Sequence, residues 1–204
     1  MNKLASILYL RKIGLPTIFP RVIISHETEK VLEIVNSFYY DYSNGWVLRC
    51  ARLPNMDDRT EGLLPWDIAH SKQELITKIF KLQKKIDNKY YVFCHEAKHM
   101  IRGGMMLIEG NRVIIEAGFG DRYELSAMFR GKSDPEQRVT FKPGMFSFKK
   151  SGKKVLTTDD LYELRIVERR FNWNYLSALT NPAIIEFSRL KKGGFYVHDI
   201  KILE

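Results

Sequence analysis

The 204-residue chain has few of the features that mark secreted, membrane or repetitive proteins. Its two cysteines, Cys50 and Cys94, are too few for a disulfide framework. No apolar run approaches the roughly 18 residues of a membrane-spanning helix, and we find no internal repeat or low-complexity tract. Arg11 and Lys12 interrupt the apolar stretch near the N-terminus, which therefore does not resemble a signal peptide. These absences predict a reduced, cytoplasmic protein that makes no membrane contact.

What is present is the composition of a globular protein with a strong positive charge. Apolar residues make up 45% of the chain and charged residues 28%, which argues against disorder. Lysine and arginine number 33 against 24 acidic residues, a net charge of +9. Residues 130–170 hold 11 basic and 6 acidic residues, and so +5 of this total. Such an excess favours a polyanionic partner, nucleic acid or a phosphorylated ligand, bound through residues 130–170.

Hydrophobic periodicity predicts a mixture of helices and strands. Helices are expected over residues 2–13, 27–38, 71–86 and 158–175. Strands are expected over residues 21–24, 46–51, 89–95, 105–108, 112–117, 137–142, 145–149, 183–188 and 195–202. Ser71 and Glu74 form a capping box for the third helix, and Thr158 is the expected cap of the fourth. Residues 52–68 are expected to form a loop.

The order of these elements predicts two lobes with a boundary near residue 88. An N-terminal α/β lobe covers residues 1–88, and a strand-rich lobe covers residues 89–204. The glycine pairs Gly103-Gly104 and Gly118-x-Gly120 are interpreted as turns between strands. A cleft between two lobes is a natural place for a ligand.

His95-Glu96-Ala97-Lys98-His99 matches the zinc-hydrolase pattern H-E-x-x-H. On a helix its two histidines share one face and bind zinc, while the glutamate acts as a general base. The preceding residues 90–94 are aromatic and β-branched, which is typical of a strand, and the pattern has no third ligand nearby. An accidental match is the more economical interpretation, and a zinc hydrolase stays as an alternative.

A series of short segments occurs in an order known from one family of phosphotransfer enzymes. The segments are Lys3 followed by Gly14-Leu15-Pro16, Val47-Leu48-Arg49, Asp57-Asp58, Phe93–Ala97, Val113–Gly120, Gly131–Pro135, Ile185-Glu186-Phe187 and Phe195–Lys201. In this order they resemble the N-terminal nucleotide-binding domain of phosphoenolpyruvate synthase and pyruvate phosphate dikinase. The resemblance extends over nearly the whole chain, and its strength is the shared order.

The resemblance implies an α+β, ATP-grasp-like fold with two subdomains around a cleft, and ATP with magnesium as cofactors. It implies that Lys3, Arg49 and Lys201 neutralise phosphates, with Arg49 and Lys201 as the catalytic residues. It implies that backbone groups of Glu96 and Ala97 line the adenine, that Glu116 helps to bind the cofactor, and that Glu186 holds magnesium with Glu116 or Asp199 as further ligands. Carboxylate oxygens are the ligands that magnesium prefers.

The chain departs from the family pattern at positions that matter for metal and phosphate binding. Ile184 stands where the family has an aspartate, and Lys201 stands where it has an arginine. Three functions therefore remain. The first is an ATP·Mg-binding phosphotransferase, or a ligase-type activator of an acceptor that the sequence does not identify. The second is a degenerate, non-catalytic ATP-grasp module that binds nucleic acid or a protein. The third is the zinc hydrolase.

Overall fold

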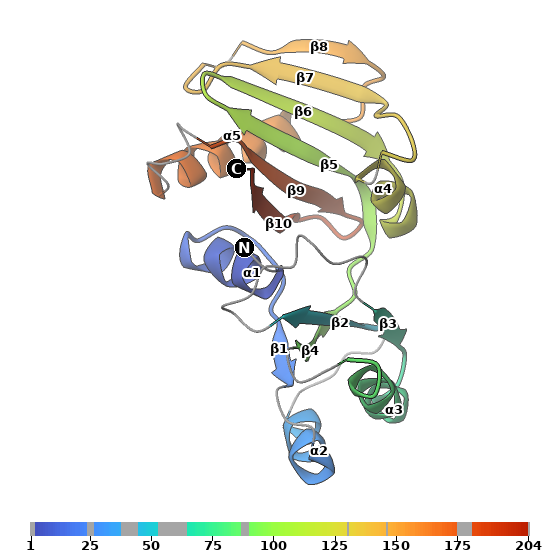
Figure 1. The fold of residues 1–204 in the computed structure, drawn as a ribbon. Coiled ribbons are helices and arrows are strands. Elements are labelled where there is room, and N and C mark those ends of the chain that lie inside the picture. Colours follow the sequence, from blue (N-terminus) through green and yellow to red (C-terminus); the bar gives the residue numbers. More distant parts are fainter. Residues whose placement is uncertain are drawn as a thin grey trace. The chain divides into compact units, whose positions relative to one another are not determined.

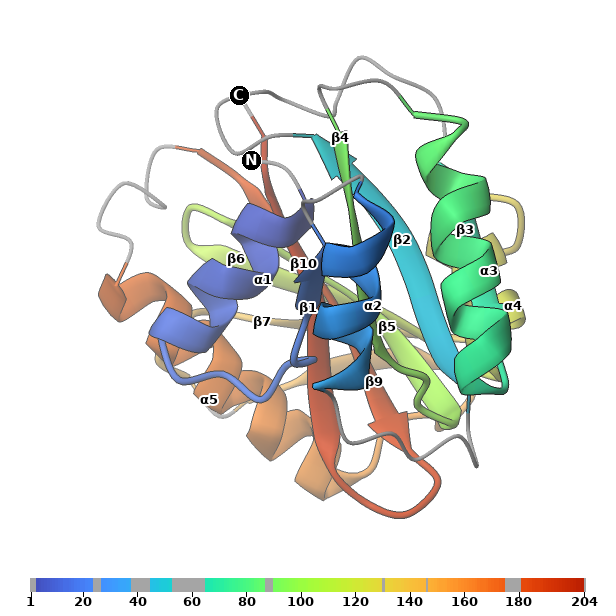
Figure 2. The same cartoon turned by 90° about the horizontal axis from the view of Figure 1, so that it is seen from below.

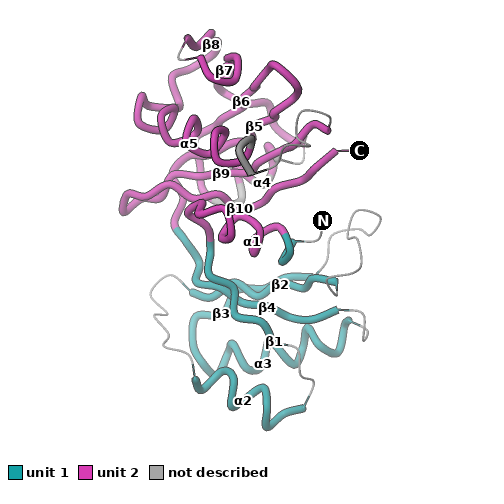
Figure 3. Tube along the Cα trace, turned by 90° about the vertical axis from the view of Figure 1, so that its left-hand side faces the viewer, with its two compact units in different colours: residues 1–5, 18–98 teal, residues 6–17, 99–204 magenta. Residues whose placement is uncertain are grey.

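The computed structural model describes residues 3–23, 27–37, 45–52, 65–86, 90–129, 131–145, 147–174 and 181–203. The acidic pair Asp57-Asp58 lies outside these residues. The chain divides into two compact units, one formed by residues 1–5 and 18–98 and the other by residues 6–17 and 99–204 (Figure 3). The boundary expected near residue 88 precedes β4, whereas the division between the units follows Lys98.

The first unit is a four-stranded antiparallel sheet with two helices against one face (Figures 1 and 2). Its elements are β1 (Arg21–Ile23), α2 (Thr28–Asn36), β2 (Trp46–Arg52), β3 (Trp66–Ala69), α3 (Lys72–Gln83) and β4 (Tyr90–Glu96), with strand order β1-β4-β2-β3. Alternate residues of β2, Trp46, Leu48 and Cys50, belong to a core shared with Leu75 and Ile79 of α3. Because side chains alternate along the strand and apolar residues recur at helical spacing on α3, both elements direct apolar side chains into this shared core.

The capping box predicted at the start of α3 is present. The side chain of Ser71 accepts a hydrogen bond from the backbone N–H of Glu74 at 3.1 Å. The Glu74 carboxylate in turn accepts from the backbone N–H of His70 at 2.7 Å. Two backbone donors at the open end of the helix are thereby satisfied, which fixes where α3 begins.

The second unit is built on a six-stranded antiparallel sheet (Figure 1). Its elements are most of α1 (Lys3–Lys12), then β5 (Met100–Glu109), β6 (Arg112–Phe119), α4 (Arg122–Phe129), β7 (Gln137–Phe141), β8 (Lys149–Gly152), α5 (Thr158–Asn174), β9 (Ala183–Leu190) and β10 (Phe195–Ile202). The strand order is β10-β9-β5-β6-β7-β8. The edge of β10 is paired with the segment after α1, since Val197 N–H donates to the Pro16 carbonyl at 2.8 Å.

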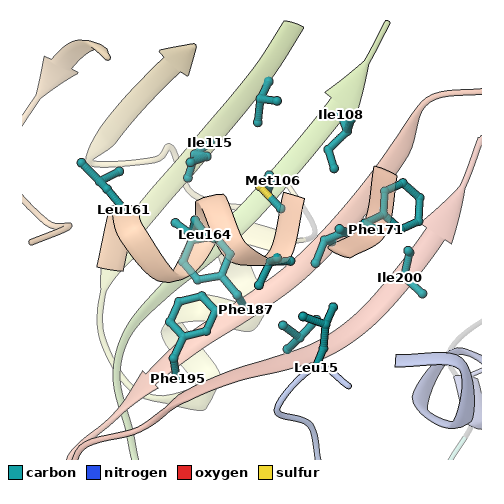
Figure 4. Close-up of a cluster of buried hydrophobic side chains, with 14 of the residues drawn as sticks. Leu15, Met106, Ile108, Ile115, Leu161, Leu164, Phe171, Phe187, Phe195 and Ile200 are labelled. Carbon is teal, nitrogen blue, oxygen red and sulfur yellow. The ribbon is translucent and has the colours of Figure 1, made fainter. Parts of the chain in front are cut away.

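One face of this sheet, here called the inner face, carries the core of the second unit (Figure 4). Buried side chains of α5, including Leu161, Leu164 and Phe171, pack against strand residues such as Met106, Ile115 and Phe187. Leu10, Ile13 and Leu15 from α1 and the segment after it belong to the same cluster. Because alternate strand residues point to opposite faces, the neighbours of these core residues lie on the other side, the outer face.

Several local expectations prove wrong. Residues 66–68, expected in a loop, belong to β3, and Gly118, expected in a turn, lies within β6. Residues 122–129 form the helix α4, which the hydrophobic periodicity did not predict, and the strand expected over 145–149 is instead β8, which begins at Lys149. Gly103 and Gly104 lie within β5 rather than in a turn. No helix among the described residues is long and apolar enough to cross a membrane.

Candidate functional site

The candidate site is a row of side chains on the outer face of the second unit. The strand registers place five residues side by side across five strands: Asp199, Glu186, Met105, Glu116 and Arg138, in the order β10, β9, β5, β6, β7. The direct sequence neighbours of three of these residues are buried in the inner-face core. They are Met106 after Met105, Ile185 before Glu186 and Ile115 before Glu116. The row therefore faces away from that core, with three carboxylates on one sheet surface.

A β-bulge brings the first two carboxylates together. Val197 pairs with Phe187, but the register shifts before the next pair, so that Asp199 and not His198 lies opposite Glu186. A bulge inserts one extra residue into one strand and leaves two residues facing one. The carboxyl groups of Glu186 and Asp199 thus occupy directly opposed positions on neighbouring strands, although the aspartate position of the family pattern is filled by Ile184.

Asp199 is tied to the helix that precedes the sheet in sequence. Its Oδ1 atom accepts a hydrogen bond from the Ser6 hydroxyl at 2.6 Å and one from its neighbour's backbone, Ile200 N–H, at 3.0 Å. The Ile200 N–H also donates to the Ser6 oxygen at 2.8 Å. Asp199 is only 4% exposed and Ser6 is fully buried. The α1 serine therefore fixes the position of one carboxylate of the row.

Glu186 is paired with Lys201, which lies two residues beyond Asp199 on β10. The distance from Lys201 Nζ to Glu186 Oε1 is 3.4 Å, and the side chains are 55% and 14% exposed. Burial alone would lower the pKa of Lys201, but the charges of Glu186 and Asp199 outweigh it and hold that pKa above its usual range. The lysine is consequently a firmly charged cation beside two carboxylates.

Glu116 lies farther along the row and has a cation of its own. Its Oε1 atom accepts a hydrogen bond from Arg138 Nε at 3.0 Å and a second from Nη2 of the same guanidinium. Met105 on β5 lies between Glu116 and Glu186, so the two carboxylates are separated by two strand spacings, about 10 Å. The structure thus brings Glu186, Asp199 and Lys201 together and leaves Glu116 apart.

Two polar residues that lie beside the row were not identified as site residues from the sequence. The Ser188 hydroxyl lies 2.5 Å from His198 Nε2, and Ser188 is fully buried. Ser6 is the other residue that sequence reasoning missed. Because the bulge and the path of α1 set these contacts, no local pattern in the sequence could have revealed them.

The remaining predicted residues lie in the first unit or at the start of α1. Arg49 is partly buried on β2, opposite Phe93 of β4, and points away from the helices because its neighbours Leu48 and Cys50 face them. Glu96 ends β4 and forms an ion pair of 2.5 Å with Lys98. The backbone N–H of Ala97 donates to the Gly45 carbonyl at 2.8 Å, so this donor is already used within the protein. Lys3 is the first residue of α1.

The zinc-hydrolase pattern lacks the helix that it needs. His95 lies in β4, and His99 immediately precedes β5. The His95 Nδ1 atom is 2.9 Å from the carbonyl oxygen of Glu96, a local contact with the backbone. Among the residues that the structure describes, no group of three or more metal-binding side chains occurs. Since the motif works through two histidines on one helical face, it has no support here.

The contacts of Glu186, Asp199 and Glu116 decide whether the row of carboxylates fits a resident magnesium ion. Magnesium needs oxygen ligands in a near-octahedral arrangement, usually with one or two carboxylates. Glu186 and Asp199 supply such oxygens, but an ammonium group already compensates Glu186, and Ser6 and Ile200 already donate to Asp199. Glu116 is compensated by Arg138. This donor set does not fit a resident magnesium centre.

Comparisons with known proteins find relatives only among solved structures. No protein-family model matches the chain, and no curated protein matches it. D-alanyl-alanine synthetase A from Vibrio cholerae is similar over 98% of this chain, with a TM-score of 0.60 and 10% identity. The biotin carboxylase domain of 2-oxoglutarate carboxylase from Hydrogenobacter thermophilus is similar over 100%, with a TM-score of 0.58 and 13% identity. The macrocyclase MdnC from Microcystis aeruginosa, bound with the precursor peptide MdnA, is similar over 97%, with a TM-score of 0.53 and 10% identity.

These similarities concern the fold and only a part of each relative. The chain spans 54% of the synthetase, 51% of the macrocyclase and 40% of the carboxylase domain. Together with the antiparallel sheets and the helices that cover them, they confirm the predicted fold class. The chain has an α+β, ATP-grasp-like fold.

Proposed function

We propose that this protein binds ATP and supports a ligase-type activation of an acceptor. The observation that carries the proposal is that the fold matches nucleotide-bound enzymes over almost the entire chain. The similar carboxylase domain was solved with MgADP and bicarbonate. Carboxyaminoimidazole ribonucleotide synthase from Aspergillus clavatus, similar over 97% of this chain with a TM-score of 0.54 and 10% identity, was solved with ATP.

The ligase-type reaction is preferred to phosphotransfer of the phosphoenolpyruvate-synthase kind. The similar structures include a D-alanyl-alanine synthetase, a macrocyclase and an L-amino acid ligase from Bacillus licheniformis, the last over 99% of this chain with a TM-score of 0.52 and 12% identity. A common fold hosts many reactions, so this preference is an argument by analogy. The phosphotransferase remains the second form of the proposal because of the colinear sequence segments.

In this proposal the basic residues neutralise phosphate oxygens. Arg49 is the principal candidate, because its planar guanidinium binds phosphate through two donors and always carries its charge. Lys3 and Lys201 contribute point charges. Glu96 and Ala97 line the adenine through backbone groups other than the Ala97 N–H, which donates to Gly45. No step is assigned to magnesium bound by Glu186, Glu116 or Asp199.

A thermal-shift measurement with ATP tests the proposal. A ligand at about 100 times its Kd stabilises a folded protein by about 2.7 kcal/mol. For a chain of this size that corresponds to a rise in Tm of roughly 5–10 °C. We expect ATP to raise the Tm of the wild-type protein and Arg49→Ala to abolish the rise.

Arg52→Ala provides the matched control. Arg52 lies on the same strand, and its Nε donates to the hydroxyl of Tyr90 at 3.2 Å. It lies three residues from Arg49, and the two point to opposite faces of the sheet. We expect this variant to keep the ATP-dependent rise even if its starting Tm is lower. No rise for the wild-type protein at millimolar nucleotide, or an equal rise for Arg49→Ala, contradicts the proposal.

A further inference from the structure

Glu186 has a carboxylate and an ammonium group as close neighbours within the second unit. Glu186 and Asp199 face each other across β9 and β10, where paired positions bring Cβ atoms to about 5 Å. Two carboxylates at that separation repel each other, and an opposite charge beside them offsets the repulsion. Lys201 supplies that charge from the same strand as Asp199, with its Nζ atom 3.4 Å from Glu186.

The position of Lys201 also follows from the bulge. Lys201 pairs with Ile184 and Asp199 pairs with Glu186, so the lysine is the diagonal neighbour of Glu186 on the outer face. If the same residues continued in regular register, His198 would lie opposite Glu186, and Asp199 and Lys201 would point to the inner face, among apolar residues. The bulge therefore delivers an aspartate and a lysine together to one glutamate.

We propose that Lys201 is a built-in counter-ion that takes the role of a divalent cation beside Glu186 and Asp199. An ammonium group has three donors and no lone pair, so it compensates carboxylates but cannot share a metal ion with them. Its positive charge also repels a divalent cation at the same carboxylates. This inference rests on the proposed function and adds to it. It means that the carboxylates of this site are compensated by Lys201 and do not need a resident magnesium ion.

Replacing the lysine with an uncharged residue of similar length tests this inference without nucleotide. Lys201→Met removes the positive charge beside these two carboxylates, so the variant melts at a lower temperature than the wild-type protein in the presence of a chelator. Mn²⁺ restores its Tm, whereas the Tm of the wild-type protein stays unchanged. We expect electron paramagnetic resonance of free Mn²⁺ to show about a tenfold gain in affinity for Lys201→Met, because a repelling positive charge is removed.

Two further variants show whether the gain arises at this site. Glu186→Gln in the Lys201→Met background removes the added Mn²⁺ binding, because one of the two carboxylates is lost. Lys192→Met is the matched control, since Lys192 is an exposed residue of the turn between β9 and β10, and it behaves as the wild-type protein does. If Lys201→Met does not fold, Lys201→Gln provides the same uncharged position with a polar end.

The opposite results overturn the inference. One is a wild-type protein that binds Mn²⁺ through Glu186 as tightly as Lys201→Met does. The other is a folded, uncharged variant that gains no Mn²⁺ affinity. Because neither measurement contains ATP, a failure of the proposed nucleotide binding leaves both readouts intact, and the two proposals can fail separately.

Discussion

Gly104 is required by the close approach of two strands and not by a turn. The sequence predicts a turn at Gly103-Gly104, but both residues lie inside β5. A Cβ atom at Gly104 would lie far inside van der Waals contact with the carbonyl oxygen of Glu116 on β6. Glycine inside a strand commonly marks such a close approach of another backbone. The glycine thus allows β6 to approach β5 at the centre of the carboxylate row.

Gly104→Ala is therefore expected to destabilise the protein strongly. The methyl group meets backbone that cannot move aside without disturbing the strand pairing, and overpacking of this kind costs about 2–4 kcal/mol. Urea unfolding followed by circular dichroism measures the loss.

Gly118→Ala on the adjacent strand is the matched control for this substitution. A Cβ atom there lies 3.4 Å from the Met128 sulfur, an ordinary contact, and we expect a change below about 1 kcal/mol. Equal stability of the two variants would show that the backbone does not approach Gly104 as closely as described.

At the residue scale, the sequence names candidate residues but not the contacts between them. Glu186 and Lys201 can be found from the resemblance, and the structure places them in one ion pair. The resemblance names Asp199 as one possible further ligand, but no sequence pattern marks the bulge that places Asp199 rather than His198 opposite Glu186. Ser6 lies 193 residues from Asp199 in the chain. A contact over that separation depends on the path of the whole unit, and no local pattern encodes it.

At the scale of elements, α5 is attached to the sheet through its first turn. The cap is Thr157, one residue before the expected Thr158: its Oγ1 accepts from Asp160 N–H at 3.2 Å, and Asp160 Oδ2 accepts from Thr157 N–H at 2.9 Å. Asp160 also accepts from Arg102 of β5 at 2.8 Å and Arg189 of β9 at 2.7 Å. Its side chain is only 1% exposed. One carboxylate therefore joins a helix start to two strands.

This junction predicts a pH dependence of stability. Burial alone would raise the pKa of Asp160, but hydrogen bonds from Thr157, Arg189 and Arg102 outweigh burial and lower it. The folded pKa thus lies below the unfolded value of about 3.9. Ionised Asp160 stabilises the fold fully above that value, and the contribution is lost as the pH falls through the folded pKa.

Asp160→Asn is expected to cost about 2–4 kcal/mol near neutral pH, because it leaves two partly buried arginines without their anion. The difference in unfolding free energy between the wild-type protein and the variant should shrink below about pH 4. Urea titrations over a pH series measure it. Asp159→Asn, at the exposed neighbouring position of the same helical turn, should show only a small difference. A gap for Asp160→Asn that does not change with pH would contradict the assigned role of the carboxylate.

The elements found from sequence are those with a sustained period. The predicted strand over 195–202 agrees with β10 residue for residue, because its apolar residues alternate over most of its length. The helix α4 was missed, since its eight residues give too short a pattern among short strands. Its signal was a capping box: Asp121 N–H donates to the Glu124 carboxylate at 2.8 Å, and Glu124 N–H donates back at 3.3 Å. An aspartate with a glutamate three residues later is readable in sequence.

At the scale of the whole molecule, the positive charge is unequally shared between the two units. Residues 6–17 and 99–204 hold 20 basic and 13 acidic residues, so this unit accounts for +7 of the total +9. Part of that excess lies on β8, the last strand of the six-stranded sheet, where Lys149 and Lys150 are exposed. Lysines on an edge strand discourage pairing with another chain. They also supply the charge that a polyanion requires.

Binding of a short RNA at increasing salt distinguishes these two roles. If the second unit binds polyanions, the wild-type protein binds RNA at low salt and loses affinity linearly on logarithmic axes as counter-ions compete. Replacing Lys149 and Lys150 with glutamate should weaken this binding about tenfold, because several phosphate contacts are lost. The same change at Lys72 and Lys81, exposed on α3 of the other unit, should have little effect.

If the wild-type protein shows no RNA binding at low salt, or both pairs of substitutions weaken binding equally, the lysines of β8 serve to keep the edge of the sheet unpaired. In that case, removing their charge with Lys149→Thr and Lys150→Thr should promote self-association.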